Sequence, residues 1–147
     1  VALAYDLGTP NAALAASRNS PYPAGGPLAD WGGSKGGVNG FPKQIVSGTL
    51  APGSPFSVAL DQGKASSVAF WVIGLDADFL PFKGGVLVPQ LDKVVGPLPL
   101  NAAGSLHLTL TWHAGLPPGQ TIDMQWWIPD LWANPLSAST DAHLVQP

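Results

Sequence analysis

Glycine and proline interrupt this chain so often that long helices are excluded and short extended segments are favoured. The 147 residues contain 18 glycines and 16 prolines, and both residue types end helices and mark turns. All nine acidic residues are aspartate, which prefers turns and caps, whereas glutamate suits helix surfaces. Hydrophobic residues make up 46% of the chain, which argues against global disorder. The composition therefore indicates an all-β fold of many short strands.

Segments with apolar residues at every second position follow one another from residue 44 to the end. We predict strands over residues 44–50, 56–61, 67–75, 85–89, 93–100, 105–112, 121–128 and 137–145. In the clearest strand, 105–112, alternation turns one set of side chains inward: Leu106, Leu108, Leu110 and Trp112. Residues 67–75 are apolar on both faces, which indicates a central strand covered on two sides. The predicted core includes Val72, Leu108, Leu110 and Trp126.

This spacing of short strands predicts that residues 44–147 form a β-sandwich, of jelly-roll or immunoglobulin-like type. Residues 1–43 are richer in glycine and proline, and we interpret them as a long extended N-terminal arm. Within the arm, residues 11–18 have the composition of a short helix. The first residues alternate as in a strand, with one face formed by Val1, Leu3, Tyr5 and Leu7.

The alternating start of the arm suggests how copies of the chain would associate. A strand supplied by one copy to the sheet edge of the next is donor-strand complementation, and residues 25–40 would then be the spacer. The alternative is that the arm folds back onto its own domain. Low charge, with charged residues at 10% and a net charge of -3, leaves little repulsion between copies.

Charge and hydropathy also exclude some partners. The chain has no basic patch for nucleic acid and no apolar run long enough for a membrane helix. Cysteine is absent, so disulfides cannot staple the fold. The sequence starts at Val1, for which we expect removal of a signal peptide and hence an extracellular protein, with a trimmed chain as the alternative.

Three groups of polar residues are candidate sites, and a structural role is expected for each. His107 and His113 lie about 20 Å apart along one strand, too far to share a metal ion. Asp76 and Asp78 fit a turn better than a calcium site. A solvated strand face is expected for Ser137, Ser139, Asp141 and His143, because triad residues converge from different elements. We therefore expect no catalytic residues, no metal, no cofactor and no enzymatic activity.

Tryptophan is abundant, with six residues in the chain. Alternation places Trp112 and Trp126 inside the sandwich. Trp31, Trp127 and Trp132 are then the aromatic candidates for contact with a partner or a glycan, since indole rings stack on other rings and on sugars.

Several short motifs resemble a domain that recurs in predicted secreted proteins of planctomycetes and myxobacteria-like bacteria. The similar segments are 5–10, 70–74, 84–89, 97–99, 103–106, 115–119, 124–130 and 137–139. In that family the last motif usually continues with asparagine, and Thr140 and Asp141 depart from it. The resemblance implies a secreted β-sandwich, and it transfers no functional residue because the family has no established activity.

These observations predict a structural subunit of an extracellular filament that binds other copies of itself through its N-terminal strand. The alternative is a secreted module that binds carbohydrate or another surface.

Overall fold

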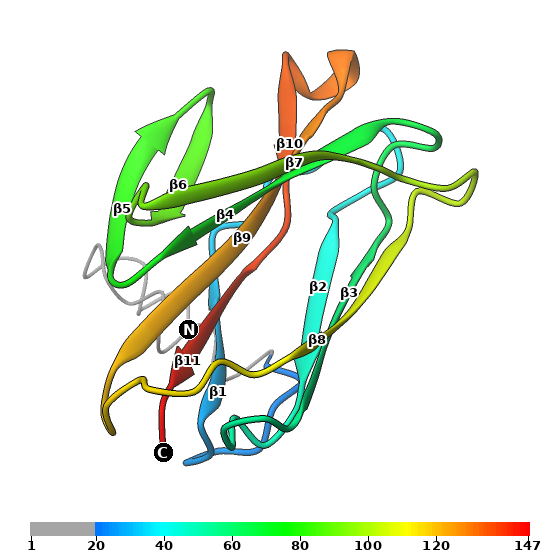
Figure 1. Cartoon of the computed structure of the whole chain (residues 1–147). Helices are drawn as coiled ribbons and strands as arrows, with labels where there is room; N and C mark the ends of the chain where they lie inside the picture. The colour runs from blue at the N-terminus through cyan, green and yellow to red at the C-terminus, as the bar shows by residue number, and fades with distance from the viewer. Residues whose placement is uncertain (1–19) are drawn as a thin grey trace.

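The computed structural model describes residues 20–147, which form an all-β fold in which two facing antiparallel sheets fit a β-sandwich (Figure 1). The larger sheet has the order β1 (Leu28–Gly32), β11 (Asp141–Val145), β9 (Thr121–Pro129), β4 (Val68–Gly74) and β7 (Lys93–Pro99), with β10 (Leu136–Ala138) also paired to β9. The smaller sheet has the order β2 (Lys43–Ser47), β3 (Pro55–Asp61) and β8 (Leu106–Thr111). The predicted strand at residues 1–7 and helix at 11–18 lie outside the described residues.

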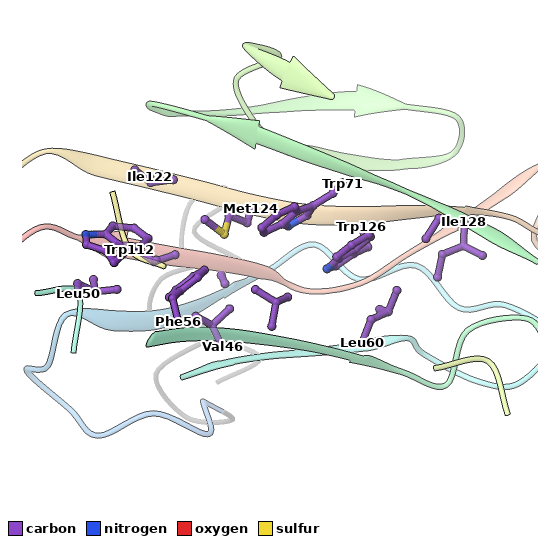
Figure 2. Close-up of a cluster of buried hydrophobic side chains, with 14 of the residues drawn as sticks. Val46, Leu50, Phe56, Leu60, Trp71, Trp112, Ile122, Met124, Trp126 and Ile128 are labelled. Atoms are coloured by element: carbon purple, nitrogen blue, oxygen red, sulfur yellow. The ribbon is translucent and has the colours of Figure 1, made fainter. Parts of the chain in front are cut away.

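The main core fills the space between the two sheets. Figure 2 shows Trp71, Met124 and Trp126 projecting from the larger sheet toward the side chains of the smaller one. Trp71 and Trp126 are directly opposite each other on β4 and β9, and their rings stack at 5.2 Å with an interplanar angle of 7°. The facing layer comes from β2 and β3 and consists of Val46, Phe56, Val58 and Leu60. The predicted alternation in these strands is therefore confirmed.

A hairpin forms a third layer on the outer face of the larger sheet. It consists of β5 (Ala77–Phe82) and β6 (Gly85–Pro89) and lies on the side of the sheet away from the main core (Figure 2). A second buried cluster forms beneath it, and its members are Val72, Leu87, Trp127 and Ala138. The prediction that residues 67–75 form a central strand covered on both sides is thus confirmed, with Ala69 and Trp71 facing one core and Val72 the other.

Gln125 and Gly74 hold the β5–β6 hairpin close to the larger sheet. Gln125 accepts a hydrogen bond from the amide of Val88 at 3.0 Å and donates one to the carbonyl of Val86 at 3.1 Å. Gly74 lies against the backbone of Gln90 with no room for a Cβ atom. The hairpin therefore sits close to the sheet at both its inner strand and its base.

Two sequence predictions about the sheet edges are wrong, and the predicted strand 137–145 is divided into β10 and β11. Leu110 faces the core side of β8 but is 41% exposed, because β8 is an edge strand with a neighbour, β3, on one side only. Residues 28–32, assigned to the spacer in the arm, form β1 and pair with β11 from Leu28↔Leu144 to Gly32↔Asp141. The sheet therefore begins before residue 44.

At the end of β9 the chain leaves the sheet and returns to it. It leads through Asp130 into a short 3-10 turn, η1 (Leu131–Ala133), and back into β10. Among residues 20–147 no helix is long and apolar enough to cross a membrane.

Candidate functional site: an open sheet edge, an aromatic tip and a buried acidic cluster

The free edge of β8 is regular, and its one ionisable side chain is His107. Six consecutive pairs join β8 to β3, from Pro55↔Thr111 to Leu60↔Leu106, with no shift of register. No described residue pairs with the other edge of β8. Such an edge presents unpaired backbone donors and acceptors to any approaching strand.

Inward side chains on β8 are only partly covered. Leu106 and Leu108 pack against the main core but are half-buried, and Leu110 is 41% exposed. Their neighbours on β3 are at most 2% exposed. A shallow depression of about 410 Å³ extends from the start of this edge and is lined by Pro99, Leu100, Asn101, Ser105, Leu106 and His107. The inner face of the smaller sheet is therefore only partly covered along β8.

The other sheet edges carry features that hinder strand addition. β7 contains Pro97 and Pro99 and an irregularity opposite Phe70, and β1 has a register shift between Asp30 and Gly32. Proline and bulges are common means of protecting an edge.

The β2 edge is protected by a side chain. The hydroxyl of Tyr22 accepts a hydrogen bond from the amide of Val46 at 2.9 Å, which occupies a donor that an added strand would need. Burial raises the pKa of Tyr22 to about 12, against a smaller opposing effect of the Val46 bond. The Tyr22 phenol therefore stays neutral over the whole physiological pH range.

Two of the three candidate contact tryptophans are covered by the chain itself. Trp127 was predicted to face a partner, but it is only 2% exposed because the β5–β6 hairpin covers it, and Phe82 meets its ring edge-on at 5.0 Å. Trp31 is half-buried and stacks on His143 at 3.5 Å and on Phe79 at 6.0 Å. The opposite direction of Trp127 relative to Trp126 was predicted correctly, but the covering hairpin was not.

Trp132 differs from the other two because it is 71% exposed, and its neighbour Leu131 is 87% exposed. Both residues lie in η1 at the end of the sandwich (Figure 1). The carboxylate of Asp130 holds this turn by accepting from the amide of Trp132 at 3.0 Å and from that of Val38 at 2.8 Å. Trp132 is therefore an exposed aromatic ring on an anchored turn.

The predicted solvated face of the last strand is wrong, since all four of its polar residues are buried: Ser137, Ser139, Asp141 and His143. Trp31 covers His143 on the outer face of the sheet, whereas Ser137 lies opposite Ile128 on the other face, close to Gly37. The two serines bond to nearby backbone groups, with the Ser139 hydroxyl donating to Thr140 at 2.9 Å and Ser137 reaching Ile128 at 3.5 Å. Neither is a nucleophile paired with the histidine.

The histidine is paired with an aspartate instead. Nδ1 of His143 lies 2.9 Å from Oδ1 of Asp123, its cross-strand neighbour on β9. Asp141 is also fully buried, and its pKa is raised well above the usual range by burial first and by Asp123 second. The sequence showed Asp123 and Gln125 as polar residues on β9, but nothing in it showed what covers them.

The remaining polar candidates stay apart. His107 and His113 are both exposed. The amide of Ala77 donates to the Asp76 carboxylate at the bend before β5, but Asp78 lies within β5 and not in the predicted turn. In the part of the chain from residue 20 onward, no three His or Asp side chains are grouped so as to hold a metal ion.

No family model matches the chain, and no curated protein or solved structure matches it either. The function is therefore inferred from the open edge, the exposed tip and the buried groups.

Proposed function

We propose that this protein is a structural subunit of an extracellular filament, joined by the N-terminal strand of one copy adding to the β8 edge of the next. The observation that carries the proposal is the edge itself, which is regular, unprotected and leaves the inner face of Leu110 and its neighbours partly uncovered. The donor is the alternating segment with Val1, Leu3, Tyr5 and Leu7, which lies outside the described residues. The resemblance to secreted bacterial domains supports the extracellular location.

The physical fit between donor and acceptor has two parts. Backbone pairing along β8 would set the register, and alternate apolar side chains would cover the exposed flank of the core. Burial of apolar area contributes about 25 cal/mol per Å², against the entropy lost when a glycine-rich segment is ordered. Because donor and acceptor are different surfaces, the contact is head-to-tail and extends into a filament unless it closes into a ring.

A pair of single substitutions tests the acceptor edge. Leu110→Lys places a charge on the inner face of β8, and we expect it to abolish filaments in negative-stain microscopy while the monomer stays folded. Ile45→Lys is the matched control, since Ile45 is 46% exposed on the opposite edge strand of the same sheet. Filaments that survive Leu110→Lys, or that are lost equally with Ile45→Lys, would contradict the proposal.

The donor is tested by deletion and by cross-linking. Deletion of residues 1–8 should leave folded protein that no longer polymerises. Since the chain has no cysteine, a cysteine at each donor position in turn can be mixed with a Leu110→Cys protein. A disulfide between the two different proteins at one or more positions is expected only if the strand is exchanged between copies, and a full-length chain that stays monomeric at high concentration excludes assembly.

The second candidate function is recognition of a carbohydrate surface, and the exposure of Trp132 favours it. An indole ring on an anchored turn offers an apolar face to a sugar ring. In isothermal titration calorimetry, cellohexaose should bind to the natural protein and to Trp132→Phe, which keeps an aromatic ring, but not to Trp132→Ala. Equal responses of the two variants would exclude Trp132 as the contact.

A further inference from the structure

Three carboxylate oxygens in the buried cluster have no hydrogen-bond partner if both aspartates are ionised. They are Oδ2 of Asp123 and both oxygens of Asp141, and both residues are 0% exposed. The other oxygen of Asp123, Oδ1, is bonded to Nδ1 of the His143 ring. Leaving buried carboxylate oxygens unpaired costs more than leaving neutral groups unpaired, so the cluster needs a further proton or cation.

A proton fits the arrangement. A protonated Asp141 can donate a hydrogen bond to Asp123, and this contact is one of the causes that raise its pKa, after burial. Two carboxyls that share one site do not both ionise readily. Asp30 on β1 adds to this effect as a further acidic neighbour of Asp141, whereas the backbone amide of Met124 opposes it by favouring the ionised carboxylate.

We propose that Asp123 and Asp141 hold one proton between them and, with His143, form a proton-operated latch that fastens β1 to the rest of the larger sheet. The latch lies on β11 and β9, and β11 is the strand that pairs β1 to the sheet. Trp31 on β1 lies flat on the His143 ring at 3.5 Å with an interplanar angle of 6°. Loss of the proton would place a second negative charge beside Asp123 and loosen this edge.

The groups around the latch offer little to offset that second charge. From β1 comes Asp30, whose own pKa is raised by burial although the amide of Gly32 bonds to it. From the segment before β1 comes Tyr22, a neutral phenol whose own pKa is raised mainly by burial and further by the nearby Asp30 and Asp141. From the hairpin comes Phe79, an apolar ring stacked on Trp31. His143 is the positive group when it is protonated, and it is already paired with Asp123.

The direction of the pH effect follows from the raised pKa of Asp141 in the fold. Its contribution to stability is fully present below the ordinary aspartate pKa, about 3.8. That contribution falls as pH rises and is lost once pH passes the folded pKa. Within this window each pH unit changes the opening equilibrium by up to about tenfold.

The experiment is hydrogen exchange of the full chain between pH 4.5 and 8.5, read as protection factors for β1 and β11 with β3 as an internal reference. We expect protection of residues 28–32 and 141–145 to fall by up to about tenfold per pH unit in the natural protein, and to stay flat in Asp141→Asn. Asp78→Asn is the control, since Asp78 is exposed on β5, and it should keep the natural slope.

Three results would overturn the proposal. The first is the same slope in Asp141→Asn as in the natural protein, and the second is a loss of protection that is equal in β3. The third is protection at pH 8 restored by calcium ions in the natural protein but not in Asp141→Asn, which would mean that the site takes a cation in place of the proton. If Asp141→Asn does not fold, carbon NMR titration of the Asp141 carboxyl in the natural protein decides, since an ordinary pKa there excludes a shared proton.

Discussion

Gln125 connects three other segments of the chain through one buried side-chain amide. Its two N–H groups serve the carbonyls of Gly33, Val86 and Ser139, with one hydrogen shared, and its oxygen accepts from the amide of Val88 and the indole of Trp127. All the hydrogen-bonding capacity of the amide is used, so its burial is fully compensated. At the scale of single residues, the outer face of β9 is therefore held by polar contacts rather than by apolar packing alone.

Replacement of this amide has a predictable cost. Gln125→Leu leaves a buried N–H, three carbonyls and an indole N–H without their partner, and we expect a loss of roughly 2–4 kcal/mol in the free energy of unfolding. Gln90→Leu is the control, because Gln90 is exposed. Urea unfolding monitored by circular dichroism measures both, and a similar effect of the two changes would contradict this account of Gln125.

The exposed fraction of a leucine side chain, and not only the sheet face on which it lies, determines how much it adds to the free energy of unfolding. Leu60 is 0% exposed on β3, whereas Leu110 on β8 is 41% exposed. Leu60→Ala should cost about 2–5 kcal/mol and Leu110→Ala about 1 kcal/mol or less, because a cavity forms only at the first site. Unfolding midpoints at equal m-values would show the difference, and equal losses would mean that the β8 edge is covered in solution.

At the scale of elements, the β5–β6 hairpin turns a two-layer sandwich into three layers. The strand β5 contributes little to the buried clusters, and its last five residues are exposed, so the hairpin depends on β6 and on its base. Gly74 lies at that base, where a Cβ atom would overlap the backbone of Gln90.

A single methyl group at this base should loosen the hairpin. Gly74→Ala is expected to destabilise by about 1–3 kcal/mol through forced displacement of the chain, with increased exchange of β5 and β6 amides before those of β3. Gly36→Ala is the matched control, since its Cβ would meet the ring of Phe41 at an ordinary 3.5 Å. Uniform loss of protection throughout the protein would argue against a local hairpin effect.

At the scale of the whole molecule, the order of strands makes the N-terminal part of the described chain essential. β1 covers the edge of β11, Leu28 packs against the main core, and Tyr22 caps β2. These contacts link both sheets to residues that precede position 43.

Two truncations separate the predicted boundary from the observed one. A chain of residues 20–147 should fold with nearly the full melting temperature, because it keeps every described contact. A chain of residues 44–147 should melt markedly lower and aggregate, because the edge of β11 and the core beneath Leu28 are uncovered. Equal melting temperatures would show that β1 adds nothing to the stability of the sandwich.

The sequence alone determined the class of fold and most strands, because alternation and turn residues act locally. The inward face of β9 and the double-sided burial of β4 follow from the order of apolar residues in each segment. What covers a face is a long-range property, and only the tertiary structure decided it. It placed the hairpin over Trp127, buried Asp141 and His143 next to Asp123, paired β1 with a strand more than a hundred residues away, and left Leu110 at an open edge. Each of these depends on which strands become neighbours, and period-two patterns are the same for an edge strand and a central one.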